Sequence, residues 1–426
     1  KLKLFSTLTK NQREAVGLLQ IGTFLEYFDL MLYVHLAVLL NELFFPKTDP
    51  KTAALLSAFA FCSTYMLRPF GALFFGYIGD QLGRKVAIIL STFLMAVACF
   101  FMSILPTYEE IGIFASVAMI ACRILQSFSA TGEVIGAEIY LSELIKPPAS
   151  YQIVSWVVEM CTLAGFASLL AASLILKCNA SWRTIFMFGG MIAISGAVAR
   201  RKLRESPDFV KSQLQKQNTD SHVISNRTSL AYFLTYTGYP LCFYLTYIYS
   251  ADILKRSFNY KAEQIIDHNL MLTLLGFVVG VSLIFMVRSF KPLSILRIRG
   301  YLAAAVLFSI PLLPIDKNIY ALTAMQILLI LFALGTTPAV PIFFKHFPTH
   351  KRFTYSSMLY AVSRALMYTI TSFGLVYLVE LLGTYGLWLI TVPVSIGFLW
   401  GVKHFEKLES VQSIEEKLAP ALAIAA

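Results

Sequence analysis

Residues 86–105 read VAIILSTFLMAVACFFMSIL, twenty positions without a charged side chain. A helix of about 20 mostly apolar residues is long enough to cross the hydrocarbon core of a bilayer. The whole chain has the same character, since 57% of its 426 residues are hydrophobic and only 14% are charged, against about 25% charged residues in soluble proteins. A soluble enzyme of this size would lack the charges to cover its surface, and 34 Phe and 21 Tyr exclude a disordered chain. The composition therefore predicts a polytopic membrane protein.

Further apolar stretches on both sides of residues 86–105 bring the number of predicted transmembrane helices to twelve. These runs cover about 15–40, 54–78, 86–105, 112–138, 151–177, 182–200, 228–250, 266–287, 300–313, 318–344, 353–381 and 384–402. The longest hydrophilic stretch, about 200–227, separates six runs from six. We therefore expect an all-α membrane protein with two pseudo-symmetric six-helix halves, a plan typical of secondary transporters. The expected parts are an N-terminal half at 1–200, a cytoplasmic linker at 201–227, a C-terminal half at 228–405 and a cytoplasmic tail at 406–426.

The distribution of basic residues predicts the orientation of these helices. Of the 35 Lys and Arg residues, 24 fall in loops on the side of the N-terminus, 8 on the other side and 3 inside the runs. Because basic loops stay in the cytoplasm, both termini are expected to be cytoplasmic. The net charge of +11 is then mainly a topology signal, and no nucleic-acid partner is expected. The six Cys show no metal-ligand spacing, so neither a metal site nor disulfides are expected.

Several short motifs lie within these runs or at their ends. Residues 76–85 read GYIGDQLGRK, 123–126 RILQ, 26–29 EYFD, 68–71 RPFG, 132–138 GEVIGAE and 347–353 FPTHKRF. The first two resemble the G-x-x-x-D-R-x-G-R-K loop and the R-x-x-Q-G element of the major facilitator superfamily, with Gln81 in place of the usual Arg. The others resemble motifs of its metabolite:proton symporter family, which includes carriers of proline and betaine, α-ketoglutarate, citrate and shikimate.

This resemblance implies the twelve-helix major facilitator fold and transport by alternating access rather than an enzymatic reaction. It further implies a monomer in the inner membrane of a bacterium, with a small solute, protons and the lipid bilayer as partners. The proton gradient would supply the driving force, and no cofactor is expected.

Charged residues inside the runs are the leading functional candidates, because a charge near the bilayer centre costs at least about 2.5–3.5 kcal/mol. At about 1.5 Å per residue, Glu26 and Asp29 lie roughly 16 and 21 Å into the first run, and Arg123 roughly 16 Å into the fourth, all near mid-depth. Tyr33 shares a helix face with both acids and is a candidate substrate contact. We expect Asp29, with Glu26, to bind the coupling proton, and Arg123 to be the ion-pair partner of this acid. The alternatives are a permanent ion pair that only fixes helix packing, or direct contact of these residues with the solute.

A second candidate site surrounds Arg364, which lies near mid-depth in the eleventh run. The second half offers no acid at that height, so this Arg is expected to bind a carboxylate of the solute. The alternative is an Arg neutralised by backbone carbonyls or by Glu133 of the first half. Tyr236 and Tyr239 lie on an aromatic face of the seventh run that suits either core packing or a quaternary ammonium. Gln326 is a further candidate substrate contact.

Two further sets of residues are candidates for conformational roles. The resemblance assigns a latch of the outward-open state to Gly76, Asp80, Gly83, Arg84 and Glu133, where the alternative is an ordinary basic turn. Arg68 and Glu159 both lie roughly 10 Å from the cytoplasmic side, so they are expected to form a structural pair or an inner gate.

Pro338 and Pro341 predict a bend in the tenth run.

Together these features predict proton-coupled uptake of a small carboxylate-bearing or zwitterionic metabolite, such as an organic acid, an amino acid or a betaine. The alternatives are an importer or exporter of a larger ligand, such as a siderophore or drug, on the same scaffold. A transporter-like sensor that moves nothing is a third possibility.

Overall fold

The computed structural model describes residues 8–45, 65–178, 181–215 and 224–425, and within these ranges every regular element is a helix. The first half and the linker contain α1 (Lys10–Phe44), α3 (Arg68–Gln81), α4 (Arg84–Ile104), α5 (Tyr108–Ile111), α6 (Ile113–Leu144), α7 (Ala149–Cys178), α8 (Trp182–Ala199) and α9 (Pro207–Gln215). The second half contains α10 (Asn226–Phe243), α11 (Ser250–Phe258), α12 (Ala262–Met286), α13 (Pro292–Ser309), α14 (Ile319–Leu331), α15 (Val340–Lys345), α16 (Arg352–Thr369), α17 (Leu375–Leu382) and α18 (Trp388–Ala425).

Two of the predicted helices continue through a π-helical turn. Such a turn over Tyr244–Tyr249 joins α10 to α11, and another over Ile370–Gly374 joins α16 to α17. Single π turns inside α-helices are frequent at functional sites. Seven helices of the described chain are long and apolar enough to cross a membrane by length and composition alone.

Most of the predicted runs coincide with helices, but some boundaries differ. The predicted start of the ninth run at residue 300 is wrong, because α13 begins at Pro292, a residue suited to a first helical turn. The bend in the tenth run is confirmed, since α14 ends at Leu331 and α15 begins at Val340. Part of the second run, residues 54–64, lies outside the described residues. The predicted tail continues the α18 helix as far as Ala425.

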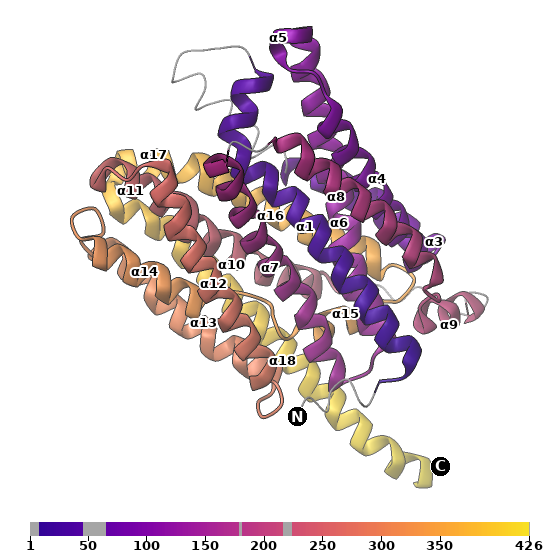
Figure 1. The fold of residues 1–426 in the computed structure, drawn as a ribbon. Helices are drawn as coiled ribbons and strands as arrows, with labels where there is room; N and C mark the ends of the chain where they lie inside the picture. The colour runs from indigo at the N-terminus through magenta and orange to yellow at the C-terminus, as the bar shows by residue number, and fades with distance from the viewer. Residues whose placement is uncertain (1–7, 46–64, 179–180, 216–223, 426) are drawn as a thin grey trace.

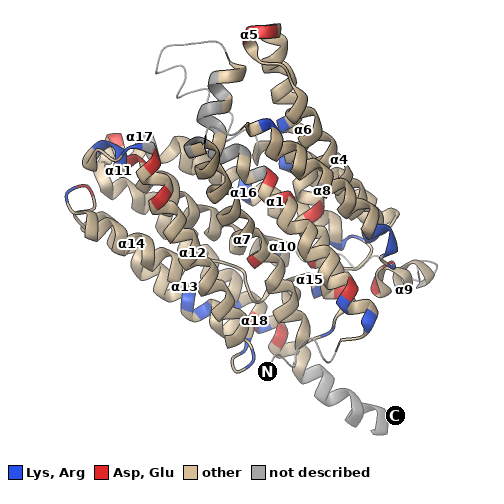
Figure 2. Ribbon diagram, viewed as in Figure 1, with Lys and Arg blue, Asp and Glu red and all other residues tan. Residues whose placement is uncertain are grey.

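The helices form two bundles that lie side by side (Figure 1), with α12, α13 and α14 in one and α1, α4, α6 and α8 in the other. The bundles meet where α16 packs on α3 and where α12 packs on α7. The start of α1, α9 and the end of α18 lie at one end of the molecule, which we call the α9 end. Figure 2 shows Lys and Arg mainly near the ends of the helices, with long uncharged stretches between them. The few charges inside the bundles therefore identify the candidate sites.

Candidate functional site

The latch predicted in residues 76–85 lies at the α9 end and joins the two halves. The Asp80 carboxylate accepts hydrogen bonds from the backbone N–H groups of Phe353 (3.1 Å) and Thr354 (2.9 Å) at the start of α16. A carboxylate is favourable there because it meets free N–H groups and the positive end of the helix dipole. Gly76 and Gly79 allow α3 to approach this closely, since a Cβ on Gly76 would lie 2.6 Å from the Thr354 Cα and one on Gly79 would lie 2.4 Å from the Phe353 ring.

A second set of bonds in the latch centres on Glu143 of α6, which the sequence analysis missed. Arg84 forms ion pairs with Asp80 and Glu143, both at 3.1 Å, and donates to the Thr349 carbonyl oxygen at 2.6 Å. Arg352 of the second half pairs with Glu143 at 2.8 Å. Arg84 and Glu143 are both fully buried, so these are charge-assisted bonds in a dry environment. The available signal for Glu143 is an acid five residues beyond the predicted end of the fourth apolar run, close to the basic loop of residues 84–85.

Gly83 lies at the start of α4, where the linker contacts the latch. Its φ of +112° is a conformation that favours glycine. The Glu205 carboxylate accepts hydrogen bonds from the backbone N–H groups of Arg84 (3.0 Å) and Lys85 (3.3 Å), and so caps this helix from the linker. Burial raises the pKa of the Glu205 carboxyl above its usual value, although the N–H donors around it oppose that rise.

The expected place of Glu133 in the latch is wrong. This buried carboxylate forms an ion pair with Arg200 at the end of α8 and also bonds to Thr92 of α4. The Arg200 guanidinium extends beside α1, where a Cβ on Gly22 would lie 1.6 Å from its Nη2 atom. Glu133 and Arg200 therefore hold together the inside of the first half.

The expected ion pair between Asp29 and Arg123 is absent from the described side chains, and a hydrogen-bonded chain connects the two residues instead. The Cys99 thiol donates to Asp29 Oδ2 at 3.3 Å, Gln126 Nε2 donates to Cys99 Sγ at 3.3 Å, and Arg123 Nη1 donates to Gln126 Oε1 at 3.0 Å. This chain crosses from α1 through α4 to α6.

Glu26 and Asp29 are both buried, with 3% and 0% of their surfaces exposed. Within the described chain no hydrogen-bond donor meets either oxygen of Glu26 or the Oδ1 atom of Asp29. A buried carboxylate without a counter-charge is costly. The side chain of Tyr33 lies outside the described residues, so its expected role remains a prediction.

Arg364 lies between the halves and is surrounded by aromatic rings. Its guanidinium carbon is 4.5 Å from the centre of the Tyr360 ring and 5.2 Å from that of Tyr239, a geometry that gives cation–π attraction. No acceptor for the buried Nε–H group is present among the described residues. Glu133, the first-half acid considered from the sequence as a partner of Arg364, pairs with Arg200 instead.

The expected pairing of Arg68 with Glu159 is also wrong. Arg68 of α3 is buried, with its guanidinium 4.4 Å from the centre of the Tyr65 ring, and its Nε and Nη2 atoms meet no acceptor in the described part of the chain. Glu159 of α7 instead faces α12, where a Cβ on Gly280 would lie 2.1 Å from its carboxylate.

The remaining candidate substrate contacts lie inside the second half. Gln326 is fully buried, donates to the Thr246 carbonyl oxygen at 2.7 Å and bonds to His268 at 2.9 Å. Its expected contact with the solute remains a prediction. Tyr236 packs its ring against Tyr360 with centroids 5.4 Å apart. Tyr236 therefore packs on the ring that contacts Arg364, and its expected contact with the solute remains a prediction.

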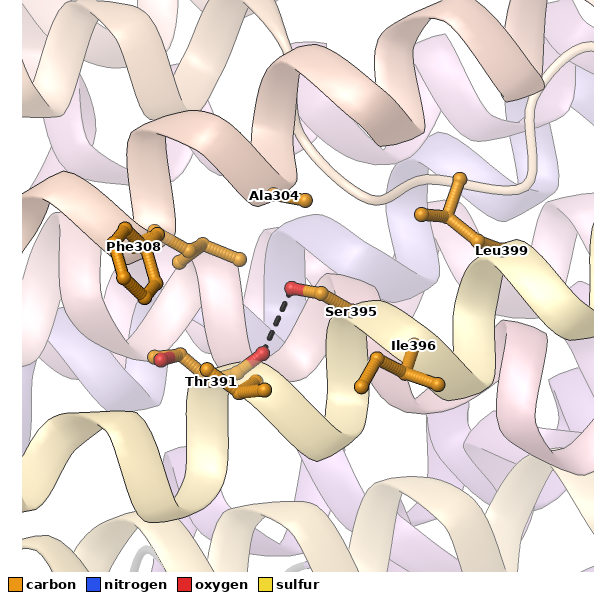
Figure 3. A pocket seen from close by; sticks show the side chains of 8 residues that line it. Ala304, Phe308, Thr391, Ser395, Ile396 and Leu399 are labelled. Atoms are coloured by element: carbon orange, nitrogen blue, oxygen red, sulfur yellow. Dashed lines mark hydrogen bonds between the residues drawn. The ribbon is translucent and has the colours of Figure 1, made fainter.

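A small cavity between α13 and α18, about 150 Å³ in volume, lies apart from these charges (Figure 3). Its lining is apolar except for Thr391 and Ser395, and the Ser395 hydroxyl already donates to the Thr391 carbonyl oxygen at 2.7 Å. The cavity therefore offers no charged group to a solute. The described residues also contain no cluster of His, Cys, Asp and Glu that could hold a metal ion.

Comparison with known proteins agrees with this architecture. The Proline/betaine transporter of Escherichia coli (strain K12) is 24% identical over 388 residues, which cover 82% of this chain and 75% of that protein. The Putative proline/betaine transporter of Staphylococcus aureus (strain COL) is 32% identical over 221 residues, which cover 49% of this chain and 47% of that protein.

Solved structures with the same fold include the proton:xylose symporter XylE, with a TM-score of 0.76 at 14% identity over 93% of this chain and 95% of that one. The human organic anion transporter MFSD10 (TETRAN) has a TM-score of 0.69 at 15% identity over 93% of this chain and the whole of that one. These neighbours support a twelve-helix architecture. The Major Facilitator Superfamily profile matches residues 19–372. The chain therefore belongs to the major facilitator superfamily, and it is a membrane transporter rather than an enzyme.

Proposed function

We propose that this transporter couples the inward movement of protons to the uptake of a small carboxylate-bearing or zwitterionic solute. The observation that carries the proposal is a pair of buried arginines between the halves, Arg68 on α3 and Arg364 on α16. Each has a guanidinium N–H group without an acceptor among the described residues. Since a guanidinium binds a carboxylate through two parallel hydrogen bonds, these groups suit an acidic group on the solute.

The candidate proton site is Asp29 with Glu26, connected through Cys99 and Gln126 to Arg123. A carboxyl group buried without a counter-charge is stable when protonated and releases its proton when water or a cation approaches. Alternating access provides such a change of surroundings in every cycle. The names of the relatives, proline/betaine transporters and a proton:xylose symporter, are consistent with a symporter of a small solute.

In the proposed transport cycle, the latch holds the two halves together at the α9 end and is released when that end opens. Asp80, Arg84, Glu143 and Arg352 bond the two halves together at the α9 end. The excess of basic residues in the loops on this side supports a cytoplasmic α9 end, with both termini in the cytoplasm of a bacterium and the protein in its inner membrane. The described conformation is then closed toward the cytoplasm. We propose that the protein works as a monomer.

The test is uptake into proteoliposomes with an imposed pH gradient, acidic outside, and a panel of labelled proline, glycine betaine, succinate and citrate. We expect at least one solute to accumulate against its gradient and accumulation to stop when the pH gradient is collapsed. Arg364→Gln should lose uptake, whereas Arg256→Gln, which removes an exposed cation of α11, should retain it. Solute movement only out of the vesicles would indicate an exporter, and binding of a siderophore or drug but of none of the panel would indicate the larger-ligand alternative.

A further inference from the structure

The hydrogen bonds that connect Arg123 to Asp29 have a direction that chemistry fixes. A guanidinium can only donate, so Gln126 must turn its Oε1 atom to Arg123 (3.0 Å) and its Nε2 atom to Cys99 (3.3 Å). Because this amide N–H group donates to the sulfur, the thiol hydrogen is left to donate to Asp29 Oδ2 at 3.3 Å. Asp29, Cys99 and Gln126 have no exposed surface, and 8% of Arg123 is exposed. Every bond in this buried chain therefore points from the cation toward the carboxylate.

The second oxygen of the Asp29 carboxyl has different surroundings. Its Oδ1 atom meets no hydrogen-bond donor among the described residues. It lies against Gly189 of α8, where a Cβ would be 2.1 Å from it. A side chain at position 189 would therefore occupy the place of this oxygen. The carboxyl group is thus held on one side by the Cys99 thiol, and on the other side it has an oxygen open to a proton, in a slot that Gly189 leaves free.

Cys99 is the titratable side chain that bonds to Asp29 in the described structure. The longer elements packed against α1 are α4, α6, α7 and α8. Further titratable and charged groups of α1 itself and of these elements make no described hydrogen bond to Asp29: Glu26 of α1, Cys122 and Glu133 of α6, Glu159 and Cys161 of α7, and Arg200 at the end of α8. The described contacts that link Arg123 to Asp29 are therefore those through Gln126 and Cys99.

We propose that Cys99 and Gln126 are positioning residues that transmit the charge of Arg123 to Asp29 Oδ2, while the proton binds to Oδ1 in the slot at Gly189. A direct ion pair would hold the acid ionised. Hydrogen bonds aligned in one direction polarise one another, so the indirect link favours the carboxylate more weakly and lets it take up a proton. The proton comes from water and bonds to Oδ1, and no other bond is broken. This inference rests on the proposed function and assigns the residues that tune its proton site.

The experiment is an infrared pH titration of purified protein in lipid nanodiscs without solute. The C=O band of protonated Asp29 is the band that Asp29→Asn removes, and its midpoint measures the affinity for the proton. Cys99→Ala should move the midpoint to higher pH by about one unit, which is about tenfold in affinity, because a donor to the ionised form is lost. Cys99→Ser keeps a donor and an acceptor in this place and should restore most of the wild-type value. Cys242→Ala removes a buried thiol of the second half and should leave the midpoint unchanged.

Gln126→Leu interrupts the chain without opening a space beside Asp29. It should move the midpoint in the same direction as Cys99→Ala. The double variant should titrate close to Cys99→Ala alone, because both changes break one chain, whereas two independent structural defects would add.

Gly189→Ala tests the slot on the other side of the carboxyl. Its Cβ should displace the Asp29 carboxyl from Cys99, so adding Cys99→Ala to this variant should change the midpoint no further. Gly196→Ala is the matched control on the same helix, since its Cβ would have nothing within 4 Å. In that background Cys99→Ala should keep its full effect of about one pH unit.

A midpoint that does not rise in either Cys99→Ala or Gln126→Leu, or shifts that add in the double variant, would overturn the inference and leave the proposed function standing. A midpoint of Cys99→Ser equal to that of Cys99→Ala would do the same. If no band that titrates is lost in Asp29→Asn and no solute accumulates under a pH gradient, the proposed function itself is refuted.

Discussion

Replacing Asp80 by Asn tests whether the latch holds the α9 end closed. The carboxylate accepts two backbone N–H groups of α16, from Phe353 at 3.1 Å and Thr354 at 2.9 Å. The amide oxygen of Asn can still accept a hydrogen bond, but without the charge that makes these bonds strong and that interacts with the helix dipole. Arg84 keeps its second ion pair, with Glu143. The variant should therefore weaken the bond between the halves without leaving a buried cation unpaired.

The size of the effect follows from these contacts. A hydrogen bond to a charged group contributes about 1.5–3 kcal/mol, and a charge at a helix end about 0.3–1 kcal/mol. Asn retains part of the hydrogen-bond contribution, so we expect the free energy that favours the closed α9 end to fall by about 2–3 kcal/mol. This change corresponds to a factor of roughly 30–150 in the equilibrium between the closed and the open α9 end. If wild-type protein were closed about 99% of the time, the variant would populate both states in comparable amounts.

The measurement is the distribution of distances between two spin labels at the α9 end, on Leu82 of the first half and Lys351 of the second, both of which are exposed. In lipid nanodiscs without solute, Asp80→Asn should add a population at longer distance. Asp252→Asn is the control, because it breaks an exposed pair with Arg256 on α11, where such pairs contribute at most about 1 kcal/mol. An unchanged, single closed population in Asp80→Asn would refute this account of the latch.

Three further predictions concern the interior. Asp29→Asn should abolish proton-driven accumulation in proteoliposomes but retain counterflow, and undiminished uphill uptake would remove Asp29 from the proton site. Arg364→Lys should bind an acidic solute at least about tenfold more weakly in titrations, because the fork geometry is lost; an unchanged affinity would exclude a carboxylate contact there. Gly22→Ala should lower the thermal unfolding midpoint because its Cβ would lie 1.6 Å from Arg200 Nη2, whereas Gly17→Ala on the same helix has nothing within 4 Å and should not.

The contact between Asp80 and Arg84 could be predicted from the sequence because its determinants are local, whereas the proposed latch role of these residues remains a prediction. Asp80 and Arg84 lie one helical turn apart in sequence, and their short loop fixes where both side chains lie. Their partners at the start of α16 could not be assigned from the loop alone, since that contact depends on how the two halves pack. Arg352, the arginine of the second half that pairs with Glu143, lies in the FPTHKRF motif, but its partner cannot be read from that motif.

Predictions that relied on depth in the membrane were less successful. Arg68 and Glu159 were expected to pair because they lie at similar heights. Height gives the position along a helix axis but not the direction in which a side chain points, and a helix turns by about 100° per residue. Arg68 contacts Tyr65, whereas Glu159 points toward Gly280 of α12. The ninth run was placed too late because a hydropathy scan excludes the charges of Arg297 and Arg299, although the helical backbone continues through both.

The spacing of three glutamates on α6 explains why one of them was assigned to the wrong partner. Glu133, Glu138 and Glu143 are five residues apart, so each successive side chain is displaced by about 7.5 Å along the axis and turned by about 140°. Two of them consequently pair with different arginines, Glu133 with Arg200 inside the first half and Glu143 with Arg84 in the latch. Because both carboxylates are fixed to one helix, a rotation or shift of α6 would alter the two ion pairs together. We therefore expect a rearrangement inside the first half to change the contact between Glu143 and Arg84 at the α9 end.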